Sequence, residues 1–428
     1  MPEDYTAHYL PNGIRLLFKP SEKFKTISIG LFVHQELNSD LAALSALLPS
    51  VLEQGSSRYP DYLTLQRQLE NLYGAEIGTD IIKSGEKHIL AFTMELAHDR
   101  FIGEGTDLLG KGMAVLGSIL AEPLLEGGAF RPDYVAQEKN QLVKDIRALL
   151  NDKAAYAMER CLQLMCGEER FGVYKLGRVE DYDKISPERL YSYYSDTFAS
   201  NPIDLYVIGD LDGAAVAEAA ASAFNFPRSE NLKVLPETEI TVPVTELKRL
   251  EEEMTVNQAK LVLGYRTYTG YTDPLYCALQ VYSGLLGGFP HSKLFMKVRE
   301  EASLAYYIHS RLEKHKGLMF IAAGINASDR SRAEEIINEQ LADTAAGRIT
   351  DHELDHTKRG LINALLSRQD SPGQMISFHL DGSVGGRVYS TAELVSGIEK
   401  VTVEDIRAVA QKVKADTAYL LKPREGAK

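Results

Sequence analysis

The stretch Ser292–Tyr307, SKLFMKVREEASLAYY, decides the fold of this chain of 428 residues. Its first part has the apolar spacing of a helix. The segments Leu304–Leu312 and Gly317–Ile325 then indicate a pair of strands. Within the stretch, Arg299 and Tyr306 stand seven residues apart. A helix followed by a strand pair is therefore expected here, and the same order of elements occurs in the first half of the chain.

An internal repeat supports this interpretation. Three pairs of segments match at separations of 232, 219 and 216 residues: Gly55–Leu72 with Gly287–Leu304, Glu138–Asn151 with Thr357–Asp370, and Lys184–Ser186 with Lys400–Thr402. We therefore predict an α+β fold of two homologous domains. Each domain is expected to hold an antiparallel sheet of about five or six strands, packed against helices.

The proline-containing, polar segment 227–245 is expected to link the two domains. This places an N-terminal domain at 1–226 and a C-terminal domain at 246–428. Within the first domain, Asp133–Ala157 is predicted as one long helical segment.

Composition excludes several classes of function. The net charge of -13 and the absence of a basic block argue against nucleic-acid binding. No apolar run approaches the ~20 residues that a membrane span needs, and the first residues lack a signal-peptide pattern. The three cysteines, Cys161, Cys166 and Cys277, have no disulfide-framework spacing. A cytoplasmic protein is expected.

Four stretches resemble one known family: LPNGIRLLF at 10–18, VLEQGSSRYP at 51–60, LGRVEDYDKISPERL at 176–190 and the stretch at 292–307. The chain resembles the insulinase-like, or pitrilysin-like, zinc metallopeptidases of the mitochondrial-processing-peptidase type. It is most similar to their metal-site-deficient bacterial paralogues, some of which have names linked to elongation factor P modification. The resemblance implies that the two domains form half of a clamshell around a chamber where unfolded peptides are cut.

That family binds zinc through an inverted His-x-x-Glu-His motif ahead of a Gly-Ser/Thr pair. Two histidines one helical turn apart hold the zinc, and the glutamate activates its water. Alignment on Gly55 places Ala46, Pro49 and Ser50 at these positions. None of the three supplies a zinc ligand or a general base, so no metal is expected in this chain. Pro49 is also expected to kink or break the helix.

The family's third ligand is an acidic residue seven positions after a glutamate, and Glu138 and Asp145 match that spacing. Two acids without histidines do not fix a zinc ion. The alternative is an exposed helix face whose acids pair with Lys139, Lys144 or Arg147.

The segment His352–His356 spells the His-Glu-x-x-His pattern of other zinc peptidases. It lies at an expected exposed helix start, carries the charged Asp355, and has no third ligand at the usual distance downstream. We interpret His352, Glu353 and His356 as a chance match.

In single-chain relatives an arginine and a tyrosine, seven residues apart in the far domain, face the zinc site of the near domain. The resemblance assigns these roles to Arg299 and Tyr306. Both would contact the substrate, and the tyrosine would stabilise the developing oxyanion. The structural alternative is that Arg299 pairs with a nearby acid (Glu300, Glu301 or Asp329) and that Tyr306 packs within a strand.

The sequence thus favours a non-catalytic subunit of a two-subunit peptidase. Its partner would be a paralogous subunit that carries the zinc, forming a heterodimer, and its ligand an unfolded peptide bound on a sheet edge. Two alternatives stay open. One is a structural scaffold of the same fold. The other is an active metallopeptidase that uses the His352 motif, or Glu138 and Asp145, as an unusual metal site.

Overall fold

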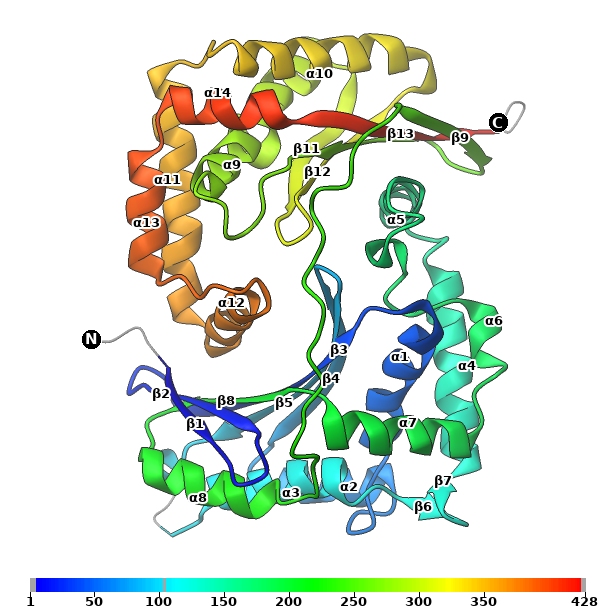
Figure 1. Ribbon diagram of the computed structural model, residues 1–428, viewed down its shortest axis with the longest axis vertical. Coiled ribbons are helices and arrows are strands. Elements are labelled where there is room, and N and C mark those ends of the chain that lie inside the picture. The colour runs from blue at the N-terminus through cyan, green and yellow to red at the C-terminus, as the bar shows by residue number, and fades with distance from the viewer. Residues whose placement is uncertain (1–4, 103–104, 425–428) are drawn as a thin grey trace. The chain divides into compact units, whose positions relative to one another are not determined.

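The computed structural model describes residues 5–102 and 105–424, which divide into two compact units. The first comprises the described residues of Met1–Arg147, Val173–Pro236 and Pro372–Ile376. The second comprises those of Ala148–Gly172, Glu237–Ser371 and Ser377–Lys428. Each unit is built around one main sheet (Figure 1).

The sheet of the first unit has six strands in the order β1-β2-β8-β3-β5-β4. All neighbouring strands are antiparallel except β2 and β8, which are parallel. The strands are β1 (Thr6–Tyr9), β2 (Arg15–Pro20), β3 (Thr26–Glu36), β4 (Glu76–Ser84), β5 (Lys87–Ala97) and β8 (Ile203–Gly209).

The sheet of the second unit has five strands in the order β11-β12-β10-β13-β9, and only β13 and β9 are parallel. The strands are β9 (Lys248–Met254), β10 (Ala259–Arg266), β11 (Ala305–Glu313), β12 (Leu318–Ile325) and β13 (Lys414–Pro423).

The two sheets share one topology. The order β4-β5-β3-β8-β2 in the first sheet corresponds, strand by strand, to the order β11-β12-β10-β13-β9 in the second. The parallel pairs also correspond: β8 with β2 in the first sheet and β13 with β9 in the second. The helices α4 (Pro132–Ala148) and α11 (Asp351–Ser367) both have 17 residues, and their starts are 219 residues apart (351 − 132). This confirms the predicted α+β class and the strand numbers. The expectation of wholly antiparallel sheets is corrected by one parallel pair in each.

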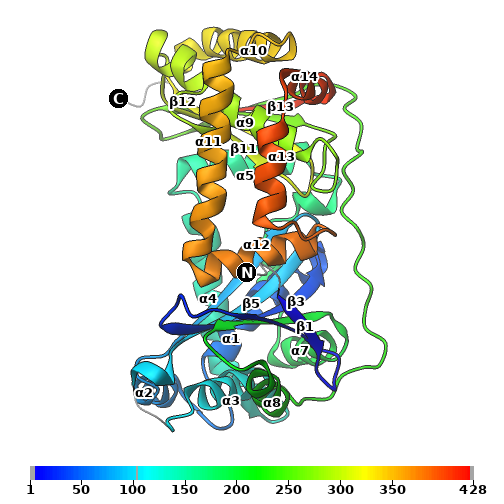
Figure 2. The same cartoon turned by 90° about the vertical axis from the view of Figure 1, so that its left-hand side faces the viewer.

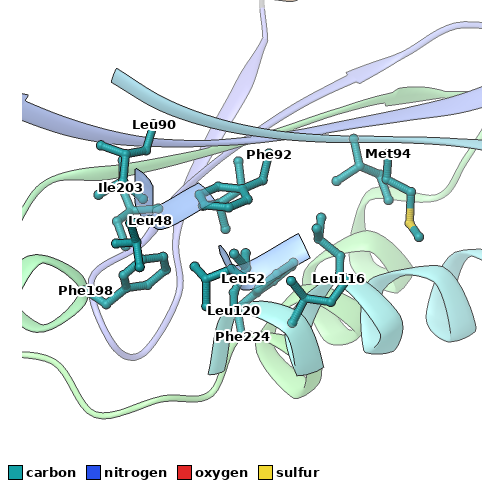
Figure 3. Packing of buried hydrophobic residues seen from close by; sticks show 14 of the residues in the cluster. Leu48, Leu52, Leu90, Phe92, Met94, Leu116, Leu120, Phe198, Ile203 and Phe224 are labelled. Atoms are coloured by element: carbon teal, nitrogen blue, oxygen red, sulfur yellow. The ribbon is translucent and has the colours of Figure 1, made fainter. Parts of the chain in front are cut away.

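Helices cover one face of the first sheet, because apolar side chains at every second position of its strands point to that face. In β5, Leu90, Phe92 and Met94 point toward Leu52 of α1 and Leu116 of α3 (Figure 3). Burial of such side chains contributes about 1.5–3 kcal/mol each. Besides α4, the first unit contains α1 (Ser39–Glu53), α2 (Tyr62–Asn71), η1 (Asp99–Phe101), α3 (Leu108–Ala121), the short pair β6 (Leu125–Glu126) and β7 (Ala129–Phe130), α6 (Val179–Tyr182), α7 (Pro187–Ser200) and α8 (Gly213–Ala223).

In the second unit a large apolar core fills the space between one sheet face and the helices. Helices α11 and α13 lie side by side (Figure 2). Besides α11, the helical segments include η2 (Arg170–Gly172), α9 (Tyr276–Ser283), the π-helical η3 (Gly284–Gly288) and η4 (Phe295–Glu301), η5 (Ala327–Asp329), α10 (Arg330–Ala345), η6 (Arg368–Asp370), α13 (Thr391–Lys400) and α14 (Val403–Lys412). Helix α12 (Pro372–Val384) begins in the first unit and continues in the second from Ser377.

The other face of the second sheet is covered by α5 (Lys153–Met165), a helix from the first half of the sequence. Gly264 of β10 permits this contact, because a Cβ there would lie 2.9 Å from the sulfur of Met165. The predicted long helix Asp133–Ala157 is therefore wrong. It is divided after Ala148, and Asp152 caps the new helix by accepting from the backbone of Ala154 and Ala155. Residues 148–172, expected in the first domain, pack with the second unit.

A buried ion network fixes the end of this segment on the sheet. Glu169 binds the guanidinium of Arg266 (Nη2 to Oε1, 2.5 Å) and the ammonium of Lys316 (Nζ to Oε2, 2.7 Å). Arg266 also donates from Nε to Asp416 at 2.8 Å. Arg266 and Lys316 have side chains only 2% and 0% exposed, so each depends on its carboxylate partner.

A second charged cluster joins the parallel strands β2 and β8 and the neighbouring strand β3 of the first sheet. Arg15 donates two hydrogen bonds to Asp204, and Nε2 of His34 lies 3.0 Å from the same carboxylate. Burial alone would raise the pKa of Asp204, but the bonds with His34 and Arg15 outweigh it and lower the pKa to about 2.

We expect this cluster to make stability depend on pH. Because the folded pKa lies below the usual value near 4, the ionised Asp204 stabilises the fold above about pH 4 and loses this effect as pH falls toward 2. Urea midpoints of the wild type and Asp204→Asn should therefore differ most above pH 4 and converge between about pH 4 and 2. A difference that is constant across this range would contradict the assignment.

Residues 225–247 contain neither helix nor strand and include the expected linker 227–245. Among the described residues, no helix is both long and apolar enough to cross a bilayer.

Candidate functional site

Helix α1 carries the positions where the family holds its zinc. Ala46 and Pro49 are buried and Ser50 is half-buried. The helix runs unbroken from Ser39 to Glu53, so the expectation that Pro49 breaks it is wrong. Proline removes one backbone hydrogen bond. Ten of the fifteen residues of the helix are buried, and this packing keeps it intact.

Glu138 lies on α4, is only 9% exposed, and accepts hydrogen bonds from Gln54 (3.0 Å) and Gln137 (3.1 Å). Burial raises the pKa of its carboxyl, and the nearby carboxylates of Glu53 and Asp145 add to this. The expected exposed acid paired with lysine or arginine is therefore not found for Glu138.

Asp145 is exposed and accepts from Gln141 of the same helix at 2.8 Å. Lys139, expected as a partner of these acids, donates instead to the carbonyl of Ile185. Across the described residues, no three His, Cys, Asp or Glu side chains are placed to hold one metal ion. The helix face therefore carries a methyl group, a pyrrolidine ring and a hydroxyl, with one buried acid, Glu138, nearby.

We predict that the purified chain binds less than one equivalent of zinc. Neutral imidazoles and carboxylates are the ligands of catalytic zinc, and Ala46, Pro49 and Ser50 supply none. Elemental analysis after dialysis against metal-free buffer measures the stoichiometry. One tightly held zinc per chain would contradict the prediction.

Arg299 lies on the π-helix η4. The amide of Ala302 donates to the carbonyl of Lys297, five residues earlier, as is typical of a π-helix. Its guanidinium lies 4.5 Å from the centre of the Phe295 ring, and its Nε lies 3.5 Å from a carboxylate oxygen of Glu300. The side chain is 40% exposed. The predicted pairing with Glu300 is present but long, and it leaves the guanidinium accessible to a ligand. The sequence predicted an ordinary helix here.

Tyr306 is the exposed residue of a bulge in β11. Ala305 pairs with Ile325 and Tyr307 with Gly324, so Tyr306 stands between two consecutive pairs and has no partner of its own on β12. Its side chain is 76% exposed. The alternative in which Tyr306 packs within the strand is therefore wrong. The bulge leaves the phenol exposed to solvent, where it can donate a hydrogen bond to a ligand.

The His352 motif begins α11 as predicted, with both histidines exposed. Glu353 is already engaged: it forms the capping box with Thr350 and accepts from Lys293 at 2.7 Å. A general base needs a free carboxylate beside the metal. One feature was not foreseen: the rings of His352 and His356 lie 3.9 Å apart, and that of His291 lies 5.6 Å from His356.

We expect His352→Ala and His356→Ala to change neither stability nor the activity of any complex by a measurable amount. Exposed positions at a helix start usually affect unfolding by less than about 0.5 kcal/mol. Thermal unfolding and peptide turnover test this expectation. A tenfold loss of turnover without loss of stability would make the motif functional.

The class of protein follows from two features: two α+β units that share one sheet topology, and a first helix without metal ligands at positions 46, 49 and 50. Residues 184–361 match the family model described as Peptidase M16 inactive domain. The chain is 37% identical to "Probable inactive metalloprotease YmfF" of Bacillus subtilis, over 97% of each protein. The chain therefore belongs to the M16 peptidase family, the insulinase-like family that its sequence resembles. It is also 22% identical to "Uncharacterized zinc protease YmxG" of B. subtilis, over 66% of this chain and 69% of that protein.

Solved structures agree with this assignment. A conserved protein from Enterococcus faecalis is 27% identical with a TM-score of 0.91, and the match covers 99% of this chain and 100% of that one. The peptidase M16 inactive domain from Pseudomonas fluorescens has a TM-score of 0.81 at 17% identity, with 99% of each chain covered. At this lower identity the likeness concerns the fold alone.

Proposed function

We propose that this chain is the non-catalytic subunit of a two-subunit M16 peptidase. Its partner would be a paralogue that holds the zinc, and the pair would act on unfolded peptides. The observation that carries the proposal is the combination of Ala46, Pro49 and Ser50 at the metal positions with an exposed Arg299 and Tyr306. The chain keeps groups suited to a substrate while lacking the groups suited to a metal.

Arg299 and Tyr306 suit the chemistry of peptide hydrolysis. Attack of water on a peptide carbonyl creates an oxyanion, which is stabilised by hydrogen-bond donors already in place. A phenol and a guanidinium are such donors, and the guanidinium can also bind a backbone carbonyl of the peptide. Because Tyr306 is 76% exposed, packing does not explain its place in the strand. A zinc site on a second chain would give both residues a role.

A structural scaffold is the second candidate. A chain of "Complex III2 from Candida albicans" has the same fold, with a TM-score of 0.75 at 15% identity, so this fold also occurs in a chain of that complex. The accessible guanidinium of Arg299 and the exposed phenol of Tyr306 favour the peptidase subunit, because a scaffold needs neither. Two B. subtilis relatives, one named inactive and the other named a zinc protease, fit the proposed pairing.

Affinity purification from the native cell tests the pairing. The tagged chain should co-purify with a chain that carries the inverted zinc motif, in near-equal amounts after size-exclusion chromatography. Recovery of only the tagged chain, or of an assembly without a zinc-motif chain, would favour the scaffold.

A further inference from the structure

The π-helix η4, which carries Arg299, is anchored on helix α11 by the segment that precedes it. Residues 289–293 lead from the π-helix η3 toward η4. π-Helices are rare in proteins and are often found at functional sites. Because so rare a pattern is not fixed by its own hydrogen bonds alone, the position of η4 depends on contacts with other elements. Three such contacts join residues 289–293 to one face of α11.

Two of these contacts are made by alternate residues of the segment. The ring of Phe289 lies against Gly360, since a Cβ at that glycine would lie 2.6 Å from the ring. Nε2 of His291 lies 3.2 Å from Oγ1 of Thr357. Thr357 and Gly360 are three residues apart and therefore share one face of α11. The segment thus runs along this face toward the first turn of the helix.

The third contact is a buried ion pair at the start of α11. Nζ of Lys293 donates to Oε1 of Glu353 at 2.7 Å, and the two side chains are 9% and 23% exposed. The other carboxylate oxygen of Glu353 accepts from the backbone of Thr350 at 2.8 Å. Burial alone would raise the pKa of Glu353, but the bonds with Lys293 and Thr350 outweigh it and lower the pKa. A buried ammonium ion depends on such a carboxylate, so Lys293 is fixed at this point.

Lys293 is also the first residue of the helical run that carries Arg299. The run is unbroken from Lys293 to Glu301. Leu294 and Val298, each at 0% exposure, hold one side of the run in the apolar core, and the ion pair holds its start. A shift of Lys293 would therefore move the backbone that carries Arg299.

We infer that the ion pair between Lys293 and Glu353 positions Arg299 for the peptide substrate. Lys293 is a positioning residue in this sense, because it acts through Arg299 and does not itself contact the peptide. The inference rests on the proposed function, in which Arg299 binds the substrate. It also gives Glu353 of the His-Glu-x-x-His stretch a role that needs no metal.

Steady-state cleavage of fluorescein-labelled casein by the reconstituted pair tests this inference. Lys293→Met should raise KM about tenfold, the effect of losing one hydrogen bond to a charged group, and should change kcat less. Lys293→Arg keeps a cation beside Glu353 and should bring KM back to within about twofold of the wild type. Glu353→Gln removes the same ion pair by a smaller change, since glutamine also completes a capping box, and should raise KM to a similar extent.

Lys297→Met is the matched control. Lys297 lies on η4 itself and pairs with Glu301 at 2.8 Å, but its side chain is 47% exposed. The same loss of a lysine from an ion pair should therefore leave KM within about twofold of the wild type.

A double-mutant cycle separates positioning from a general structural role. If Lys293 acts through Arg299, adding Lys293→Met to Arg299→Ala should raise KM no further. Hydrogen exchange of the η4 amides in the isolated chain is a second measurement that needs no partner. Lys293→Met should speed this exchange about tenfold, whereas Lys297→Met should not change it.

Three results would overturn the inference: a wild-type KM in Lys293→Met when Arg299→Ala raises KM, an equal rise of KM from Lys293→Met with and without Arg299, or unchanged exchange of η4. Each would leave the two-subunit proposal standing. Conversely, a wild-type KM in Arg299→Ala would remove the role proposed for Arg299 in the function, while faster exchange of η4 in Lys293→Met would still support the ion pair as the anchor of Arg299.

Discussion

Tyr306→Phe should lower the turnover of the assembled two-subunit peptidase about a hundred- to a thousandfold, the usual cost of one preorganised oxyanion donor. The change removes only the hydroxyl. The side chain is 76% exposed in this chain, so folding and assembly should persist. Arg299→Ala should weaken substrate binding as well, because the guanidinium can hold the peptide backbone. Steady-state peptide cleavage by the reconstituted pair gives both effects.

Asp145→Asn is the matched control. Asp145 occupies a position where the family places a ligand, yet it is exposed and accepts a hydrogen bond from Gln141 of its own helix. It should have little effect on turnover, and size-exclusion chromatography should show all variants assembled. Wild-type turnover in Tyr306→Phe would show that the phenol has no role in catalysis, and the scaffold would become the better account.

Glu169→Gln should destabilise the second unit by about 3 kcal/mol, because removing one member of a buried ion network leaves its partners uncompensated. Arg266 would keep Asp416, whereas Lys316, at 0% exposure, would lose the carboxylate of Glu169 that compensates its charge, although its ammonium also donates to the carbonyl of Glu239. Urea unfolding, with hydrogen exchange of the β10 amides as a local measure, tests this result.

Glu168→Gln is the control, since the neighbouring Glu168 is exposed. It should leave the urea midpoint within about 0.5 kcal/mol of the wild type. Adding Lys316→Met to Glu169→Gln should restore part of the loss, because the double change removes both charges of one pair. Equal effects of Glu168→Gln and Glu169→Gln would show that the network does not hold this segment on the sheet.

Much of the fold could be predicted, because the spacing of apolar residues within each segment identifies it as a helix or a strand. The repeat spacing of 219 residues between Glu138–Asn151 and Thr357–Asp370 equals the separation of α4 and α11. The break before Asp152 could not be predicted from periodicity, because the apolar spacing continues through it and the break depends on the capping bonds of Asp152. The assignment of α5 to the second unit depends on a contact with Gly264, which no local pattern encodes.

The site was predictable to a similar degree. The missing ligands at Ala46, Pro49 and Ser50 follow directly from residue type, as does the Arg299–Tyr306 spacing. The carboxylate of Glu138 accepts a hydrogen bond from Gln54, 84 residues away, and this contact could not be predicted from its own helix. Likewise, the intact helix at Pro49 reflects tertiary packing that outweighs one lost hydrogen bond.

The most direct test of the two-subunit account is peptide hydrolysis by three samples: this chain alone, the zinc-bearing partner alone, and an equimolar mixture. We predict hydrolysis by the mixture only, abolished by a chelator and restored by zinc. Chelator-sensitive hydrolysis by this chain alone, or hydrolysis by the partner alone as fast as by the mixture, would contradict it.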